Sequence, residues 1–145
     1  MRIADILQQK GSNVATVDAQ ATMDSAISML VERRIGAIPV SDDGRRLQGI
    51  VSERDVVRAV AKGSDFSTMK VGELMTAKVY TCAPESTLAE VMTLMIDKGI
   101  RHVPVVEADA LVGILSIRDL VDARLREAEV ERQQMADYIA NRTYN

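Results

Sequence analysis

The hydrophobic pattern of this chain repeats itself once. The apolar segment VATV at 14–17 returns as VYTC at 79–82, and AIPV at 37–40 returns as HVPV at 102–105. Both pairs have an offset of 65, since 79 minus 14 and 102 minus 37 are each 65. A third pair, GIVSERD at 49–55 and GILSIRD at 113–119, has an offset of 64. A duplicated unit therefore covers most of the sequence.

The periodicity inside each copy predicts the same order of elements. A short strand is followed by apolar residues at helical spacing, which are Ala26, Ile27, Leu30 and Val31 in one copy and Val91, Met92, Met95 and Ile96 in the other. Thr22 and Thr87 are suited to cap these helices, and Gly36 and Gly99 are expected to end them. Strands at 37–41 and 102–106 follow, and a further strand enters a last helix. The predicted unit is β-α-β-β-α, twice.

The connections indicate an α/β fold. A strand, helix, strand crossover favours a parallel pair of strands with helices covering the sheet. Pro39 and Pro104 cannot donate a ladder hydrogen bond, so they suit an edge or a bulge. We expect a first repeat with an N-terminal helical segment at 1–63, a linker with the second repeat at 64–127, and a helical extension at 128–145.

The end of the last strand in each copy carries the candidate chemistry. Ser52 with Asp55, and Ser116 with Asp119, have the spacing of helix capping boxes. The same helix start has free N–H groups that favour anions, and an Arg follows each serine by two positions. Hydroxyl and guanidinium suit a phosphate, whereas a carboxylate accepts hydrogen bonds from sugar hydroxyls. The pattern thus fits a binding site for a phosphorylated ribose. It also fits two helix caps that bind no ligand.

Composition narrows the class of protein. The 145 residues are 47% hydrophobic and 27% charged with a net charge of -3, which is typical of a globular protein. Cys82 is the single cysteine, so we expect a reducing compartment. The start of the chain does not resemble a signal peptide, and no stretch suits a membrane span, so the expected location is the cytoplasm. Acidic charge and 3% aromatic residues argue against nucleic-acid binding.

Catalysis and metal binding find no support in these residues. One histidine and one cysteine, far apart, do not make up the usual set of metal ligands. Ser52 and Ser116 have no histidine arranged to activate them as nucleophiles. We therefore expect no enzyme activity, no metal and no catalytic cofactor.

These repeats and motifs resemble a tandem CBS-domain protein, also called a Bateman module. The resemblance spans about Met1 to Arg126. It implies two repeats packed with pseudo-twofold symmetry, leaving two clefts that commonly bind AMP, ADP, ATP, NAD(H) or S-adenosylmethionine. It also implies a regulatory module that pairs into a homodimer and signals to an effector protein whose identity the sequence does not give. The alternative is a structural dimerisation protein with vestigial clefts.

The resemblance also implies roles for individual residues. Asp55 and Asp119 would bind ribose hydroxyls, Ser52 and Ser116 would lie on the phosphate side, and Arg54 and Arg118 would contact phosphate. The adenine walls would be formed by Thr16, Val17, Ile38, Pro39, Thr81, Cys82, Val103 and Pro104.

The two copies differ just before the proline segments. Gly36-Ala37 in the first copy corresponds to Arg101-His102 in the second. In the family, basic residues at this position often reach ligand phosphates. Our hypothesis is that Arg101 and His102 make one cleft, or the centre of a dimer, bind phosphate more strongly. A lone histidine beside a strand also fits a structural hydrogen-bonding role.

The end of the chain predicts a long helix with a coiled-coil-like seam. Residues at successive steps of 4, 3, 4, 3 and 4 are Val121, Leu125, Ala128, Arg132, Met135 and Ile139. We expect this helix to contact a partner subunit. The alternative is a solvated helix of mixed charge that extends from the second repeat.

Overall fold

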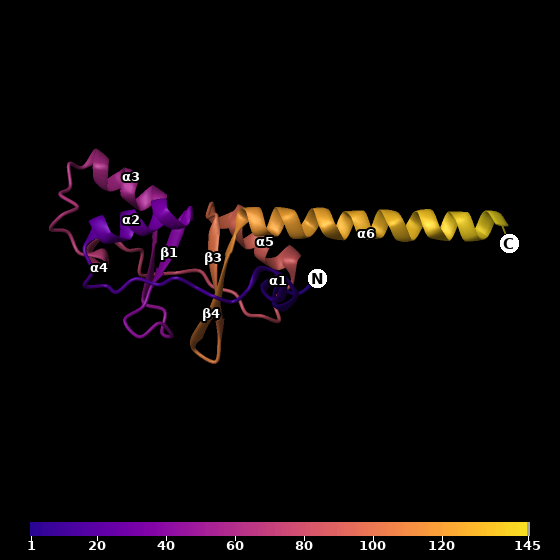
Figure 1. Cartoon of the computed structure of the whole chain (residues 1–145), viewed down its shortest axis with the longest axis horizontal. Coiled ribbons are helices and arrows are strands. Elements are labelled where there is room, and N and C mark those ends of the chain that lie inside the picture. Colours follow the sequence, from indigo (N-terminus) through magenta and orange to yellow (C-terminus); the bar gives the residue numbers. More distant parts are fainter. Residues whose placement is uncertain (145) are drawn as a thin grey trace.

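The computed structural model describes residues 1–144 and shows two α/β repeats side by side, with one long helix projecting from the second (Figure 1). The first half of the chain forms α1 (Ile3–Lys10), α2 (Met23–Arg33), β1 (Ala37–Val40), β2 (Gly49–Ser52) and α3 (Glu53–Ala61). The second half forms α4 (Val71–Leu74), α5 (Leu88–Lys98), β3 (His102–Glu107), β4 (Ala110–Ser116) and α6 (Ile117–Tyr144). Helix α6 runs unbroken across the boundary expected at residue 128.

The predicted caps at the starts of α2 and α5 and at the end of α5 are present, but the predicted end of α2 is not. The hydroxyl of Thr22 accepts from the backbone N–H of Ser25, and Thr87 forms a capping box with Glu90. Gly99 ends α5 in the left-handed conformation at φ 62°. The prediction that Gly36 ends α2 is wrong, because the helix stops at Arg33 and Arg34 takes the left-handed conformation itself.

Each repeat contains a two-stranded antiparallel sheet, β1 with β2 and β3 with β4. The expected parallel pairing is present only as single bridges, Val17 with Val40 and Cys82 with Val105. The strand expected at 14–17 is therefore reduced to one bridge residue, because the chain turns at Asp18, whose carbonyl accepts from the N–H of Ala21. A bulge follows Pro104, where the β3–β4 register shifts between Val105 and Val106.

The two short helices α1 and α4 exchange places between the repeats. Ile3, Ile6 and Leu7 of α1 belong to the core of the second repeat, with α5, β3, β4 and the start of α6. Val71 of α4 belongs to the core of the first repeat, with α2, β1 and β2. Backbone hydrogen bonds fix both crossings, for example from Ile3 N–H to the Ser86 carbonyl. Each core therefore contains a segment from the other half of the chain.

Two glycines allow this exchange at equivalent places. A Cβ on Gly113 would lie 2.6 Å from a methyl group of Leu7 in α1. A Cβ on Gly49 would lie 2.6 Å from the sulfur of Met75 and 2.9 Å from the backbone oxygen of Thr76. That oxygen accepts from the N–H of Ile50 at 3.0 Å, so it is held in place. Leu7 of α1 and the segment after α4 thus each pack directly on a strand that leads into a Ser/Asp motif.

Across residues 1–144, no helix combines the length and the apolar character that crossing a membrane requires.

We expect Gly49→Ala to destabilise the protein more than Gly113→Ala. The first new methyl group meets a fixed backbone oxygen, whereas the second meets only the movable end of a leucine. Overpacking should reduce the free energy of unfolding by about 2 kcal/mol or more for Gly49→Ala and by about 1 kcal/mol for Gly113→Ala. Urea unfolding of both variants measures the difference. Equal losses would contradict the role given to the Thr76 oxygen.

Candidate functional site

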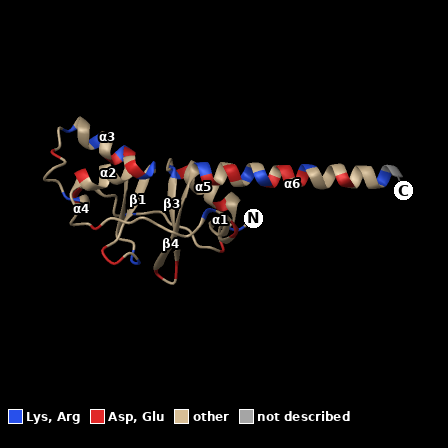
Figure 2. Ribbon diagram, viewed as in Figure 1, with Lys and Arg blue, Asp and Glu red and all other residues tan. Residues whose placement is uncertain are grey.

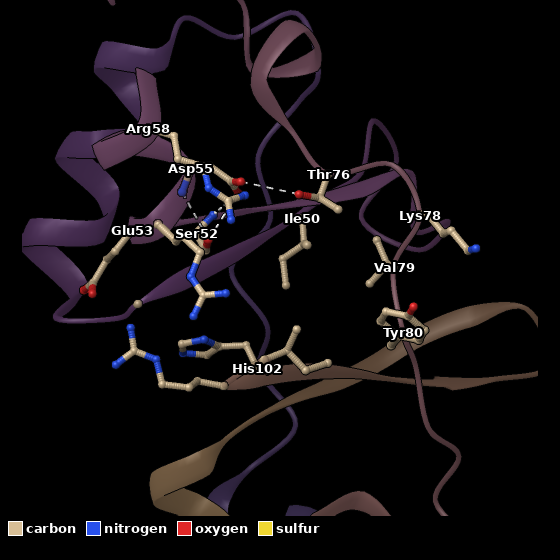
Figure 3. Close-up of a pocket in the computed structure, with 14 residues that line it drawn as sticks. Ile50, Ser52, Glu53, Asp55, Arg58, Thr76, Lys78, Val79, Tyr80 and His102 are labelled. Atoms are coloured by element: carbon tan, nitrogen blue, oxygen red, sulfur yellow. Dashed lines mark hydrogen bonds between the residues drawn. The ribbon is translucent and has the colours of Figure 1, made fainter. Parts of the chain in front are cut away.

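A cavity of about 220 Å³ lies where the two repeats meet (Figure 3). Four segments contribute to its wall: Gly36 before β1, the first Ser/Asp motif with the start of α3, the stretch after α4, and the start of β3 with the two residues before it. The residues that line it are Gly36, Ile50, Ser52, Glu53, Arg54, Asp55, Arg58, Thr76, Lys78, Val79, Tyr80, Ile100, Arg101 and His102.

Asp55 is the buried carboxylate of this cavity. Its side chain reaches back to the helix cap, where Oδ2 accepts from the N–H of Ser52 at 2.9 Å and from its hydroxyl at 3.1 Å. The other oxygen, Oδ1, accepts only one long hydrogen bond, from the hydroxyl of Thr76 at 3.4 Å (Figure 3). Asp55 is only 8% exposed. A carboxylate oxygen accepts more than one hydrogen bond, so Oδ1 retains capacity for a ligand hydroxyl.

Cations outnumber carboxylates around the cavity. Arg54, Arg58, Lys78 and Arg101 contribute to the wall, against Glu53 and Asp55. Arg54 donates to the backbone oxygen of Gly99 at 3.1 Å, which ties α3 to the second repeat. Within residues 1–144, none of the ion pairs includes Arg58, Lys78 or Arg101. The cavity is therefore suited to an anionic group such as phosphate.

Gly36 and His102 are complementary in shape across the two repeats. A Cβ on Gly36 would lie 2.8 Å from Cε1 of His102, so a larger residue would require this ring to shift. Burial lowers the pKa of His102 below 6.5, and the charge of Arg101 lowers it further, although Glu53 opposes the shift. The neutral form of the His102 imidazole is therefore favoured. The positive charge beside Gly36 therefore comes from Arg101. The ring of His102 packs in the space that Gly36 leaves.

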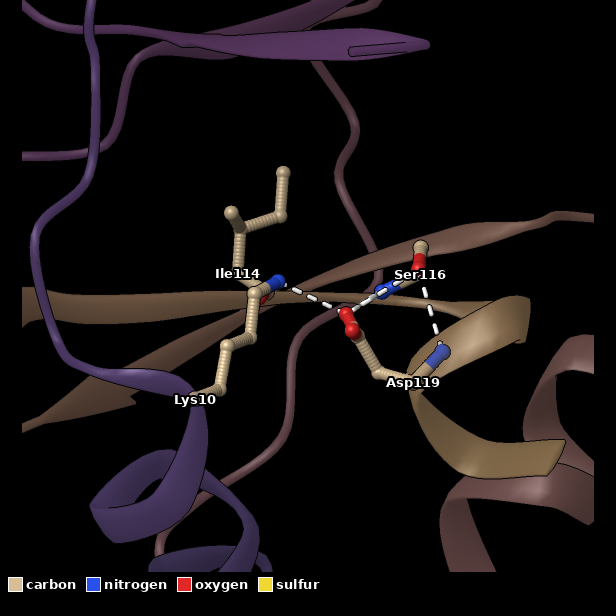
Figure 4. A network of polar contacts seen from close by, with 4 residues as sticks. All are labelled: Lys10, Ile114, Ser116 and Asp119. Atoms are coloured by element: carbon tan, nitrogen blue, oxygen red, sulfur yellow. Dashed lines mark hydrogen bonds and ion pairs between the residues drawn. The ribbon is translucent and has the colours of Figure 1, made fainter. Parts of the chain in front are cut away.

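The second Ser/Asp motif is occupied by a side chain of the same chain (Figure 4). Asp119 accepts from the N–H and hydroxyl of Ser116 at 2.8 and 3.0 Å, as Asp55 does at Ser52. Here, however, Nζ of Lys10 lies 2.6 Å from Oδ2 of Asp119 and 2.7 Å from the backbone oxygen of Ile114. The two capping boxes are alike, but the two carboxylates have different partners.

The length of the short helices explains this difference. Helix α1 has eight residues and α4 has four, although Leu7 and Met75 occupy equivalent places over Gly113 and Gly49. The additional turn of α1 carries Lys10 onto Asp119.

The CBS domain family matches this chain twice, over residues 3–62 and 71–126. This chain belongs to the CBS domain family. The predicted resemblance and the predicted two-repeat fold are thereby confirmed.

Three known proteins illustrate the similarity. The mitochondrial CBS domain-containing protein CBSX3 of Arabidopsis thaliana is 33% identical over 94% of this chain and 71% of its own length. A CBS-domain-containing protein of Agrobacterium tumefaciens is 40% identical, with a TM-score of 0.81 over 86% of this chain and 99% of its own. The CBS domain pair of protein MJ0100, in complex with 5′-methylthioadenosine and S-adenosyl-L-methionine, is 25% identical, with a TM-score of 0.76 over 85% of this chain and 98% of its own.

The cavity of this CBS pair gathers five residues for which a ligand role was predicted. They are Ser52, Arg54, Asp55, Arg101 and His102. The Ser116 and Asp119 side chains lie at the Lys10 contact instead, and Arg118 is exposed on α6.

The residues predicted as adenine walls lie elsewhere in the CBS repeats. Val17, Ile38 and Val103 are core residues, and Pro39 and Pro104 are buried with their carbonyl groups accepting from the bridge residues. Thr16 is half-buried, and Thr81 lines a separate open hollow beside the hairpin loops. Cys82 is half-buried, and burial raises the pKa of its thiol to about 11.

Sequence reasoning missed several residues of the cavity wall. Ile50, Thr76, Lys78, Val79 and Tyr80 line it without having been singled out, as does Arg58. Two signals could have found some of them. Arg58 follows Arg54 by four positions, so both lie on one face of α3. Val79 and Tyr80 lie three and two positions before Cys82, the bridge residue of the second repeat.

Among residues 1–144, no group of three or more His, Cys, Asp or Glu side chains is placed to hold a metal ion.

The ion pair at the second motif alters the titration of Asp119. Burial alone would raise the pKa of this carboxyl, but the hydrogen bond from Lys10, the Ser116 N–H and the charge of Lys10 outweigh it. The net result is a pKa below the ordinary 3.8. The ionised form is therefore stabilised in the folded protein. Its contribution to stability is present above pH 3.8 and is lost as the pH falls through the lowered pKa.

We expect Lys10→Met to reduce the free energy of unfolding by about 1 kcal/mol at pH 7, the magnitude of a partly exposed ion pair. The loss should shrink as the pH falls below the ordinary pKa of Asp119, because protonation removes the pair in the parent protein as well. Urea unfolding of ligand-free protein at pH 7 and pH 3 measures both values. Lys78→Met is the matched control, since no ion pair of residues 1–144 includes Lys78. A loss independent of pH would contradict the ion pair.

Proposed function

We propose that this CBS pair is a regulatory module that senses an adenosine phosphate, namely AMP, ADP, ATP or NAD(H), in the cavity between its repeats. The observation that carries the proposal is the buried carboxylate of Asp55, whose Oδ1 faces a cavity lined by Arg58, Lys78 and Arg101. A carboxylate acceptor beside cations that form no ion pair suits a ligand with both sugar hydroxyls and phosphate.

The other walls fit the nucleoside part of such a ligand. Ile50, Val79 and Ile100 provide aliphatic surface, and Tyr80 provides a phenol ring. An adenine base would lie against these side chains with the ribose toward Asp55. The similar MJ0100 pair, in complex with two adenosyl compounds, supports this ligand class. Both of those compounds lack phosphate, whereas the cations of the present cavity favour a phosphorylated ligand.

The two Ser/Asp motifs are proposed to act differently. Asp55 keeps an oxygen available for the ribose, whereas Asp119 is held by Lys10 at 2.6 Å. A ligand at the second motif would have to displace this lysine first. We therefore propose one nucleotide per chain, bound in the first cavity.

Ligand binding would act on the relative orientation of the repeats. The cavity takes residues from both of them, so a ligand that prefers one arrangement shifts the population toward it. We propose that the change is read by an effector protein or by a second copy of the chain, in the cytoplasm. No catalytic role is proposed, because no activated nucleophile lies beside the cavity among the described residues.

A structural role without ligand is the second candidate. The observation that favours it is that the hydroxyl of Ser52 already donates to Asp55 and accepts from its N–H, so the motif is satisfied as a helix cap. On this view the CBS pair holds an assembly together and its clefts are vestigial.

We expect Asp55→Ala to weaken binding of AMP, ATP or NADH about ten- to hundredfold, because a ribose hydroxyl loses its charged acceptor. Isothermal titration calorimetry on ligand-stripped protein measures the affinity. Asp119→Ala is the matched control, since it removes an equivalent capping carboxylate; each variant should lose about 1 kcal/mol of stability as a cap, and Asp119→Ala about 1 kcal/mol more with the Lys10 ion pair. Affinity retained in both variants, or no binding by the parent protein, would favour the structural role.

We expect Arg101→Ala to weaken AMP binding about tenfold and to leave adenosine binding unchanged, because only the phosphate is paired with the guanidinium. Comparing the two ligands by calorimetry separates phosphate contact from a general loss of folding. Arg118→Ala, on the exposed face of α6 next to the second motif, is the matched control. Unchanged affinity and stoichiometry for AMP in Arg101→Ala would rule out the proposed phosphate contact.

A further inference from the structure

Helix α6 has two separate apolar stripes. The first faces the second repeat, where Leu120 is 0% and Ala123 5% exposed. The second contains Val121, Leu125, Met135 and Ile139, which are 45%, 65%, 60% and 56% exposed. At about 100° per residue, the centres of the two stripes lie roughly 120° apart around the helix. The second stripe is therefore not a continuation of the face that packs on the core.

Helix α6 projects beyond the repeats (Figure 1), and the exposed stripe continues along it to Met135 and Ile139. From Ala128 to Arg142 every residue is exposed. Acidic and basic residues are both present along the projecting part (Figure 2). Helical stability in proteins comes mainly from the packing of an apolar face against other elements. The exposed stripe of α6 is not buried in this way within residues 128–142. A long helix with a regular apolar seam is typical of helix pairing.

We propose that the exposed stripe of α6 pairs with the α6 helix of a second copy of this chain, in antiparallel orientation. The seam is self-complementary when the helices cross in opposite directions with their midpoints at residue 130. Val121 of one copy then meets Ile139 of the other, and Leu125 meets Met135. The remaining seam positions bring Ala128 of one copy against Arg132 of the other. Every large apolar side chain of the seam thus meets an apolar side chain of the other copy. Each of these contacts is formed twice, because the two copies are related by a twofold axis.

Arg132 decides between the two orientations. A parallel pair would place Arg132 of one copy directly against Arg132 of the other, inside the seam. The antiparallel pair places it over the small side chain of Ala128, with Glu129 and Glu131 of the other copy flanking the seam. Within one chain Arg132 already lies 2.8 Å from Glu129 and is 75% exposed, so it is free to turn toward an equivalent carboxylate. Charge complementarity therefore favours a second copy in the opposite direction.

The first experiment compares seam and non-seam substitutions by sedimentation equilibrium. Leu125→Glu and Met135→Glu should each raise the dissociation constant of the α6 pairing at least about tenfold, because a buried charge is introduced. Val130→Glu is the matched control, since Val130 is also apolar and 56% exposed but lies about 180° from the seam. It should change the constant by less than about twofold. Circular dichroism verifies that all three variants fold.

Two results of this experiment would overturn the pairing. One is a parent protein that stays monomeric at about 100 µM, well above the micromolar range of weak specific pairing. The other is a mass that the two seam substitutions leave unchanged, which would assign any association to a different surface. Arg132→Leu gives an independent check, because removing the charge from the seam should tighten the pairing.

The second experiment tests the orientation by disulfide formation in a Cys82→Ala background. Val121→Cys and Ile139→Cys are prepared as separate proteins and oxidised alone and as a mixture. Antiparallel pairing predicts a disulfide between residue 121 of one protein and residue 139 of the other, formed only in the mixture. Disulfides formed by each protein alone would overturn the antiparallel orientation, and so would the absence of any disulfide in the mixture.

Discussion

The exchange of α1 and α4 between the repeats is the packing on which the rest of this structure depends. Apolar residues of α1 complete the core of the second repeat, and Val71 of α4 completes the core of the first. Separating the repeats would therefore open both cores at once. The same crossing brings Thr76 and Lys78 to Asp55, and it brings Lys10 to Asp119. The hydrophobic contacts that hold the halves together thus also place the polar groups of both motifs.

A duplicated sequence has produced two unequal sites through small local changes. One is the replacement of Gly36-Ala37 by Arg101-His102, which puts a cation and a ring on one side of the interface and leaves space for the ring on the other. The other is one additional turn of helix in α1. Pseudo-twofold packing is retained while the chemistry of the two carboxylates diverges.

The features that sequence predicted best are local ones. Both Ser/Asp capping boxes, the caps at Thr22 and Thr87, and the order of the elements depend on spacing within a few residues. Contacts between distant segments were not predicted. The pairing of Lys10 with Asp119 joins residues 109 positions apart, and the contact of Gly36 with His102 is likewise set by tertiary packing. Val17 and Ile38, expected at a cleft wall, are core residues because their short strand segments pack inward.

Because α6 starts within the second motif, a tilt of that motif moves the whole helix. This helix begins at Ile117, directly after Ser116, and runs for 28 residues, so its length is about 42 Å. If the second motif tilts by about 5° as a rigid body, the far end of a lever this long moves by roughly 4 Å. Such a displacement is comparable to the spacing between neighbouring side chains along a helix. A rearrangement too small to disturb the cap at Asp119 would therefore be amplified into a sideways displacement of several ångströms at the tip.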